Sequence, residues 1–528
     1  MPGLRAFPIF GDEAIYLHWA QLIAARPFAA AFVSLQDPKP PLHFWFLALW
    51  VPLFEDPVFA GRILSVAAGA ASIWLAAGVA RETAKRFGLP ELSRSAGAGA
   101  ALFAVFCPFA AFYQRLALAE SLFVAECLAA VWLALRVASG KGRRAGALWP
   151  GRGLALGAVL GAAMLSRQSF SYVLWALPPA ALLCLRSGER ATPAAFSLRM
   201  FLAAAVALIF WSPYLLAPGG PSLAVRAFHL AAYREPLSFG RRIENLSSVA
   251  LSITTYLTPP VALFALFSLA WLFAVHRRRA AAFLVAWFAV ATLPLALFGS
   301  IFFSRYALSA SIPLWIACGI GLAGSFARIR SLRPRATRTA LAAAAVAVLF
   351  AWPAAELVRQ AADWESQTLT VEDRRQYSSG WPAGPASEAA VEFLKAQARR
   401  GPIVLITPEI SGNPTDAAWV LFRGNPRVGL FSVKDVFGGP VRRDVPGRPG
   451  NLRLFGDLRE LGPDAPVDVA GRRVFFIAPD PLVTPDGWRP AEQYLRLRNP
   501  SIAAVARFVN PPGERGVPPA AVTVFRLP

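Results

Sequence analysis

The sequence predicts a polytopic α-helical membrane protein with an α/β domain at its C-terminal end. Hydrophobic residues make up 56% of the 528 residues, charged residues only 16%, and mean hydropathy is +0.47. Soluble proteins carry about 25% charged residues. The apolar residues gather in blocks of roughly 20, the length of a membrane-spanning helix, and these blocks stop near residue 357. We therefore expect an N-terminal external loop at 1–60, a transmembrane bundle at 61–357 and a separate domain at 358–528.

Two short apolar stretches precede the bundle, at Ala14–Ala25 and Pro41–Leu53. Both are too short to cross a bilayer comfortably. They contain Trp19, Trp45 and Trp50, and tryptophan favours the membrane–water interface. We expect two helices that lie at the interface within the external loop.

Ten longer apolar stretches follow, and each is predicted to span the membrane. They lie near 61–80, 95–113, 116–137, 152–166, 169–186, 196–216, 247–274, 280–299, 305–326 and 337–356. The stretches on either side of Ser166–Ser169 are short, so a single broken helix is an alternative there. All four cysteines lie inside apolar blocks, which predicts neither a disulfide framework nor a cysteine metal site.

Charge orients the predicted bundle. The net charge is +22, and the arginines and lysines of the predicted bundle are concentrated in every second connection between the apolar blocks. By the positive-inside rule these connections are cytoplasmic, so the chain before 61, the 217–246 loop and the chain after about 357 face outside. In a soluble protein this charge would suggest nucleic acid. Here it serves topology and contact with lipid headgroups, and we expect no nucleic-acid partner.

The C-terminal region alternates strand-like and helical segments. Glu388–Arg400 has the pattern of an amphipathic helix. Ile403–Thr407, Val474–Ala478 and Val522–Arg526 are short apolar runs that predict buried strands. Pro-Gly turns separate these segments, which together indicate a small extracytoplasmic α/β domain.

Three carboxylates are candidates for catalysis. Asp12 and Glu13 are adjacent ahead of an interfacial helix. The structural alternative is a helix N-terminus, with Asp12 as its cap and Glu13 favoured by the helix dipole. Glu120 lies at the outer start of a span, where a carboxylate is a candidate functional residue. Its structural alternative is simple neutralisation by Arg115.

The basic residues expected on the same outer face are Lys39, Arg62, Arg115, Arg167, Arg241, Arg242 and Arg305. Each alone is explained as a headgroup anchor, and Lys39 as a snorkelling lysine. Together they form a candidate anion site, because arginine and lysine hold phosphate and stabilise the charge that develops on it.

In this order the motifs resemble those of the GT-C glycosyltransferases. More narrowly, they are similar to bacterial relatives of the dolichyl-phosphate-mannose–protein mannosyltransferases and of the lipid A aminoarabinose transferase. The matching motifs are GDEAIY with Asp12, Glu13 and Tyr16, KPPLHFW with Lys39 and His43, GRILS with Arg62, LALAESLF with Glu120, SRY with Arg305 and Tyr306, and Tyr377–Pro382. The resemblance covers nearly the whole chain, although Glu120 stands where aspartate is more common.

The resemblance implies the GT-C fold and a transferase in a bacterial cytoplasmic membrane. Such an enzyme moves a sugar from a polyprenyl-phosphate donor to a hydroxyl of a protein, lipid A or a cell-envelope glycan. We assign Asp12 as the general base of an inverting displacement, with Glu13 raising its pKa. Glu120 orients the acceptor or binds a divalent cation, although no sequence pattern requires a metal. Substrate binding is assigned to Lys39, Arg62, Arg115, Arg167 and Arg305 with Tyr16, His43 and Tyr306.

The family carries a membrane helix before the Asp-Glu loop. This chain begins at Gly3–Pro8, the segment that ends that helix, so we expect the first family helix to be missing here. Two other functional classes remain open, a polyprenyl-lipid or solute transporter and a non-catalytic lipid-binding relative. The external domain and the lack of an inverted repeat disfavour the transporter.

Overall fold

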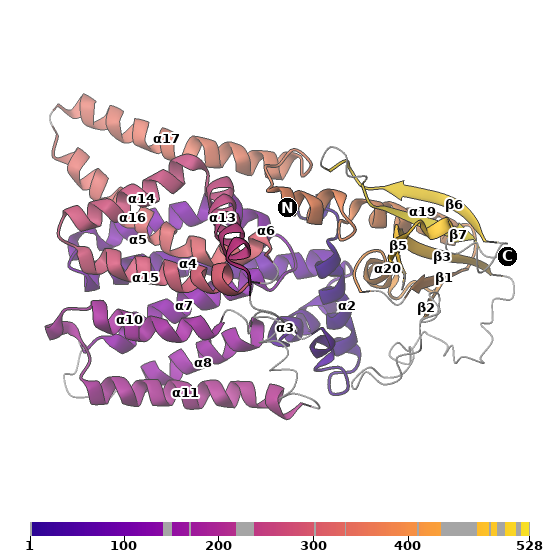
Figure 1. Cartoon of the computed structure of the whole chain (residues 1–528), viewed down its shortest axis with the longest axis horizontal. Coiled ribbons are helices and arrows are strands. Elements are labelled where there is room, and N and C mark those ends of the chain that lie inside the picture. Colours follow the sequence, from indigo (N-terminus) through magenta and orange to yellow (C-terminus); the bar gives the residue numbers. More distant parts are fainter. Residues whose placement is uncertain are drawn as a thin grey trace. The chain divides into compact units, whose positions relative to one another are not determined.

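The computed structural model describes residues 3–37, 39–140, 150–167, 171–217, 237–299, 302–332, 334–408, 411–433, 472–484, 487–493, 502–513 and 519–526 (Figure 1). The chain divides into two compact units. Unit 1 comprises Met1–Gln36, Phe44–Arg62 and Val371–Pro528, and unit 2 comprises Asp37–His43 and Ile63–Thr370. The regions predicted at 1–60 and 358–528 therefore fall mostly into one unit, because the N-terminal segments pack with the C-terminal domain.

Unit 2 consists of helices. In chain order they are α4 (Pro57–Arg86, which begins in unit 1), α5 (Ser93–Val105), α6 (Pro108–Gln114), α7 (Glu120–Ala138), α8 (Gly151–Ser166), η4 (Tyr172–Ala176), α10 (Leu177–Cys184), α11 (Pro193–Leu216), α13 (Phe239–Leu257), α14 (Pro259–Ala274), α15 (Arg278–Phe298), η6 (Ser304–Ala307), α16 (Leu308–Arg330) and α17 (Arg335–Ala362).

Six helical segments in the described residues are long and apolar enough to cross a membrane, namely α4, α7, α11, α15, η6–α16 and α17. Two further pairs of helices are bent at a short break. In the first pair, η3 (Pro90–Leu92) and α5 are followed by α6, and in the second pair α13 is followed by α14. The number of spans in the described residues rises to eight if each bent pair forms one span. The predicted spans at 152–166 and 169–186 become shorter helices, α8 and η4–α10. Length and composition therefore support six to eight spans, fewer than the ten predicted.

Prolines explain both bends. The pair η3–α5 and α6 is bent by 59° ahead of Pro108, and α13 and α14 by 108° ahead of Pro259. Proline lacks the N–H that the preceding turn needs, and it disfavours helical backbone in the residue before it. At Thr258 φ is +69°, a region that β-branched residues rarely adopt. The predicted spans 95–113 and 247–274 are therefore broken helices.

Helix α16 is the centre of unit 2 and packs against α5, α14 and α15. Small residues allow this closeness, since a Cβ at Gly319 would lie 2.5 Å from the backbone nitrogen of Ala100 on α5. Small residues at helix–helix contacts are typical of membrane proteins. The packing of α16 fixes the η6 turn at its N-terminal end, and this turn carries Arg305 and Tyr306.

Unit 1 joins N-terminal helices to the α/β domain. The N-terminal elements are α1 (Gly3–Ala6), α2 (Gly11–Ala25), η1 (Val33–Gln36), α3 (Leu42–Trp50, whose first two residues belong to unit 2) and η2 (Val51–Leu53). The C-terminal elements are α18 (Val371–Arg374), η7 (Arg375–Ser379), α19 (Pro385–Arg399), β1 (Ile403–Pro408), α20 (Thr415–Phe422), β2 (Val428–Val433), β3 (Arg473–Asp480), β4 (Leu482–Thr484), β5 (Gly487–Arg489), β6 (Ala503–Val509) and β7 (Ala521–Arg526).

The main sheet of unit 1 has the order β2-β1-β3-β7-β6. Strand β1 pairs in parallel with β2 and β3, while β7 runs antiparallel to β3 and β6. Leu394 of α19 and Trp419 of α20 belong to the core over the sheet, with Leu405 and Phe475. The predicted C-terminal helix and three strands are confirmed as α19, β1, β3 and β7. The helices predicted at Ala14–Ala25 and Pro41–Leu53 correspond to α2 and α3–η2.

Candidate active site

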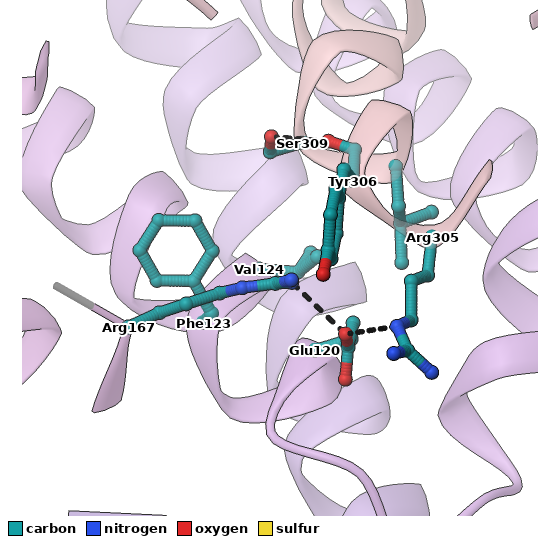
Figure 2. A pocket seen from close by; sticks show the side chains of 8 residues that line it. Glu120, Phe123, Val124, Arg167, Arg305, Tyr306 and Ser309 are labelled. Atoms are coloured by element: carbon teal, nitrogen blue, oxygen red, sulfur yellow. Dashed lines mark hydrogen bonds and ion pairs between the residues drawn. The ribbon is translucent and has the colours of Figure 1, made fainter. Parts of the chain in front are cut away.

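Glu120 is the first residue of α7, and its side chain is buried. A tight turn joins α6 to α7, with the Leu118 N–H donating to the Leu116 carbonyl at 2.7 Å. The turn leaves the Glu120 carboxylate at the N-terminal end of α7, where the helix dipole favours negative charge. Glu120 Oε1 lies 3.0 Å from Arg167 Nη1 and 3.4 Å from Arg305 Nε, as Figure 2 shows.

The two arginines reach Glu120 from different helices. Arg167 directly follows α8, where the backbone leaves the helix, and Arg305 belongs to the η6 turn ahead of α16. The Arg167 guanidinium carbon lies 4.5 Å from the centre of the Tyr306 ring, and that of Arg305 lies 4.6 Å from the Phe303 ring. Aromatic faces attract guanidinium groups, so these rings help to hold both arginines in place.

Glu120, Arg167, Arg305 and Tyr306, here called the Glu120 cluster, line one small pocket (Figure 2). Two guanidinium groups face one carboxylate in this pocket. Arginine pairs bind phosphate and carboxylate groups through charge-assisted hydrogen bonds. The pocket is therefore suited to an anion.

The second carboxylate oxygen of Glu120 is buried without a hydrogen-bond partner among the described residues. The side chain as a whole is only 4% exposed. Leaving a buried charged acceptor unsatisfied costs roughly 1–3 kcal/mol or more. Buried groups of this kind are rare and call for an explanation, and a ligand hydroxyl that donates to Oε2 supplies one.

His43 lies beside the cluster in unit 2 and is neutral at ordinary pH. Its side chain is 2% exposed, and burial lowers its pKa from 6.5 to about 4. A hydrogen bond to the backbone of Ala117 and the charge of Glu120 oppose this shift. His43 therefore adds no charge beside Glu120.

A second buried carboxylate anchors the end of α8. Ser166 Oγ donates to Glu126 Oε1 at 2.7 Å, and Ser166 is the last helical residue before Arg167. Glu126 lies less than two turns beyond Glu120 on α7. The hydrogen bond ties the end of α8 to α7 next to the place where Arg167 meets Glu120.

Asp12 and Glu13 lie in the first turn of α2, in unit 1. The N-cap is Phe10, so the structural alternative of Asp12 as cap does not hold. The Phe10 N–H donates instead to Glu13 Oε2 at 3.1 Å. Asp12 is partly exposed, whereas Glu13 is fully buried. Of the two adjacent carboxylates, Asp12 is the accessible one.

Arg62 makes five hydrogen bonds inside unit 1. Its Nε donates to Glu13 Oε1 at 2.9 Å and its Nη2 to Glu13 Oε2 at 2.8 Å. The carbonyls of Leu4, Phe7 and Pro8 accept the other three bonds. The Arg62 side chain is 1% exposed and the Glu13 side chain 0%. This pair fixes the segment ahead of Asp12 and leaves neither side chain open to a substrate.

The C-terminal domain holds the same segment from the other side. The Gly11 N–H donates to the Pro382 carbonyl at 2.8 Å, and the Ile9 N–H donates to Glu388 Oε1 at 2.7 Å. Asn413 Nδ2 donates to the Ile9 carbonyl at 3.0 Å. Burial raises the pKa of Glu388 above its ordinary value. Pro382 ends the Tyr377–Pro382 motif, whose role in unit 1 is thus to position the Asp12 segment.

The remaining predicted binding residues have their own local contacts. Lys39 Nζ lies 2.9 Å from Asp37 Oδ2. Arg115 donates to the Gln360 carbonyl at 2.6 Å and to Gln367 Oε1 at 2.7 Å. Tyr16 is buried in unit 1 between aromatic rings.

The structure thus brings four predicted residues together in unit 2, Glu120, Arg167, Arg305 and Tyr306, with His43 beside them. Asp12, Glu13, Arg62 and Tyr16 belong to unit 1. Sequence analysis did not find the positioning roles of Glu388 and Asn413. No local motif marks these two residues, because they act on a segment 379 and 404 positions away in the chain. Within the described residues, no group of three or more His, Cys, Asp or Glu is arranged as a metal site.

Comparisons with known proteins agree with the fold class predicted from the sequence. Residues 38–216 match the model of a family described as dolichyl-phosphate-mannose-protein mannosyltransferase. No curated protein matches the chain. The solved structure of ArnT from Cupriavidus metallidurans in the apo state is 16% identical, with a TM-score of 0.55, and the match covers 99% of this chain and 95% of that one. The same protein bound to undecaprenyl phosphate gives a TM-score of 0.58 at the same identity and coverage. The predicted fold class is thereby confirmed: the chain has the GT-C fold of ArnT, and over residues 38–216 it matches the dolichyl-phosphate-mannose-protein mannosyltransferase model.

Proposed function

We propose that this chain is a membrane glycosyltransferase that moves a sugar from a polyprenyl-phosphate donor to an acceptor hydroxyl. The GT-C fold and the family match over residues 38–216 support the reaction class. The ArnT structure with undecaprenyl phosphate supports the donor class. The observation that carries the proposal is the Glu120 cluster, a pocket in which two arginines face Glu120 and one Glu120 carboxylate oxygen lacks a described partner.

A lipid-linked sugar phosphate has the two groups that this pocket needs. Its phosphate is an anion for Arg167 and Arg305, and a sugar or acceptor hydroxyl can donate to Glu120 Oε2. A divalent cation is the other candidate for that oxygen. We assign the hydroxyl, because the described residues offer no set of three acidic or imidazole ligands around Glu120. Donor contact by Lys39, which is paired with Asp37, stays a prediction.

Asp12 is the proposed general base. It takes the proton of the acceptor hydroxyl as the acceptor oxygen forms a bond to the anomeric carbon of the donor. The bond from that carbon to the phosphate oxygen breaks, and polyprenyl phosphate leaves with the electron pair. This single displacement inverts the anomeric centre. Arg167 and Arg305 stabilise the charge that grows on the leaving phosphate.

Glu13 and Arg62 were predicted to act in catalysis and donor binding. Their complete mutual pairing favours a positioning role, in which they hold the chain that leads to Asp12. Donor contact by Arg115, His43 and Tyr16 stays a prediction.

We place the reaction on the outer face of the cytoplasmic membrane, with the C-terminal domain outside. The alternation of basic and uncharged connections supports this orientation. The acceptor is a hydroxyl of a protein, lipid A or another cell-envelope glycan.

The test is transfer in membranes from cells that express the full chain. Radiolabelled undecaprenyl- and decaprenyl-phosphate sugars are supplied as donors, and label is followed into protein, lipid and glycan fractions. Membranes with the chain should transfer label that control membranes do not, and the product should have the opposite anomeric configuration to the donor. Stable insertion without transfer from any donor would favour the transporter or lipid-binding alternative.

A further inference from the structure

Two arginines from distant connections meet at Gly88, on the expected cytoplasmic side of unit 2. Gly88 follows α4 with a φ of +84°. A Cβ at this position would lie 3.3 Å from Arg186 Nη2 and 3.3 Å from Arg277 Nη1. The two guanidinium groups are therefore no farther apart than the sum of these distances. Arg186 follows α10, and Arg277 lies between α14 and α15.

Local hydrogen bonds and ring stacking order the three connections. The end of α4 is closed by a hydrogen bond of 2.8 Å from the Leu89 N–H to the Ala84 carbonyl, which is the αL helix end that glycine favours. Phe87 stacks on Phe283 of α15 with ring centres 5.6 Å apart. Arg279 Nη1 donates to the Leu185 carbonyl at 3.2 Å and ties α15 to the end of α10.

The charges at this place lack compensation. Neither Arg186 nor Arg277 has an ion-pair partner in the part of the chain that the structure describes. The α15 helix begins with Arg277 as its N-cap and arginine at 278 and 279, and its first turn contains no acidic residue. A helix N-terminus carries partial positive charge, so cations there are unfavourable. An anion bound between the guanidinium groups would reduce the repulsion between the two arginines and the repulsion between the arginines and the N-terminus of α15.

The positive-inside rule explains why arginines occur in these connections, but it needs only their presence on one side of the membrane. It does not need two of them to converge on one glycine. Exposed apolar side chains occur close in sequence to the arginines, namely Leu183 on α10 and Phe273 and Val275 at the end of α14. An anionic head beside an exposed apolar surface is the chemistry of a phospholipid.

We propose that Arg186 and Arg277, with Gly88 between them, bind the phosphodiester headgroup of an acidic phospholipid of the inner leaflet. The guanidinium groups hold the phosphate oxygens, as arginine does at lipid headgroup sites. The acyl chains lie along the apolar side chains of α10 and α14. This site is separate from the Glu120 cluster and does not depend on the proposed transfer reaction.

The test is native mass spectrometry of the full chain released from nanodiscs that contain phosphatidylcholine with a minor fraction of phosphatidylglycerol. Wild-type protein should retain phosphatidylglycerol in preference to phosphatidylcholine. Arg186→Gln/Arg277→Gln should lower the retained phosphatidylglycerol about tenfold. Arg328→Gln/Arg330→Gln, which removes the same charge from another basic connection, should retain it.

Three results would overturn the proposal. Equal loss in both double variants would show that only net charge matters. Equal retention of the two lipids by wild-type protein would show no preference for acidic headgroups. Displacement of the lipid by millimolar inorganic phosphate, with no effect of glycerol or chloride, would show a site for a free anion. The variant Arg186→Lys/Arg277→Lys keeps both positive charges and serves as a control for misfolding. It should retain an intermediate amount of phosphatidylglycerol. Full retention by this variant would contradict a site that requires guanidinium groups.

Discussion

Glu120 has one carboxylate oxygen between two arginines and a second that lacks a described partner. Sequence motifs predicted Glu120, Arg167, Arg305 and Tyr306 one at a time. They did not predict which of these residues meet, because the contacts join segments far apart in the chain. The sequence also did not show that Arg62 and Glu13 contact each other. Their motifs suggested a catalytic role for Glu13 and donor binding by Arg62, whereas the structure pairs the two side chains with each other.

Glu120→Gln should lower transfer about 100-fold or more while the protein still inserts in the membrane. The substitution removes the negative charge that faces Arg167 and Arg305 and changes the group that meets the substrate. The measurement is kcat for transfer from the labelled donor in detergent, with thermal unfolding as a check on folding. Glu392→Gln, an exposed carboxylate paired with Lys395, is the matched control and should leave kcat unchanged. Full activity of Glu120→Gln would remove Glu120 from the mechanism.

His43 should make stability fall in acid. The unfolded histidine takes up a proton near pH 6.5, but the folded one does so only near pH 4. Between these values the unfolded state binds more protons, so stability rises with pH across this window and is lost as pH falls through it. The effect is at most about 3 kcal/mol. Thermal unfolding of wild type and His43→Gln between pH 4 and 7 measures it. An equal pH dependence in both proteins would contradict the assignment.

At the scale of elements, sequence patterns located most helices but not their ends. The apolar blocks predicted the helical segments of unit 2, because lipid requires every backbone group to be bonded within its own helix. The breaks ahead of Pro108 and Pro259 lie inside blocks of uniform hydropathy and were missed. In the α/β domain, β1, β3 and β7 were predicted from buried apolar runs. Strand β6 was missed because its side chains are mostly exposed or half-buried.

The segment ahead of Asp12 depends on the C-terminal domain, so distant substitutions should impair the proposed base. Asn413→Ala removes hydrogen bonds to the carbonyls of Ile9, Pro382 and Ala383. We expect a loss of about 1–3 kcal/mol in unfolding free energy and a lower kcat with little change in donor binding. Transfer kinetics and binding of undecaprenyl phosphate measure the two effects separately.

Asn425→Ala, in the turn between α20 and β2, is the matched control and should keep wild-type kinetics. Gly384→Ala should act like Asn413→Ala, since a Cβ there would lie 2.4 Å from the Ile9 carbonyl oxygen. Unchanged kcat in both Asn413→Ala and Gly384→Ala would show that this segment has no part in transfer.

At the scale of the whole molecule, the two ends of the chain form one unit. Composition suggested three consecutive regions, since hydropathy changes near residues 60 and 357. Composition could not show that the N-terminal segments pack with the C-terminal domain. That packing depends on single hydrogen bonds and on aromatic contacts. One such contact joins Phe10 and Tyr377, whose ring centres lie 4.4 Å apart. The fold class itself was predictable from the apolar blocks and the motif order.

Orientation is tested by cysteine labelling in a variant that lacks the four native cysteines. Asn425→Cys, in the C-terminal domain, should react with a membrane-impermeant maleimide in intact spheroplasts. Ser187→Cys, in the basic connection after α10, should react only after the membrane is opened. The positive-inside rule predicts this difference. The reverse pattern would place the C-terminal domain in the cytoplasm and overturn the proposed site of reaction.

The central claim is that Asp12 acts as the base of a sugar transfer from a polyprenyl-phosphate donor. The most direct measurement compares purified wild-type protein and Asp12→Asn in proteoliposomes that contain a labelled donor for which the wild type is active. The account predicts that Asp12→Asn binds the donor as the wild type does but transfers sugar at least about 100-fold more slowly. Transfer by Asp12→Asn at the wild-type rate would contradict the account.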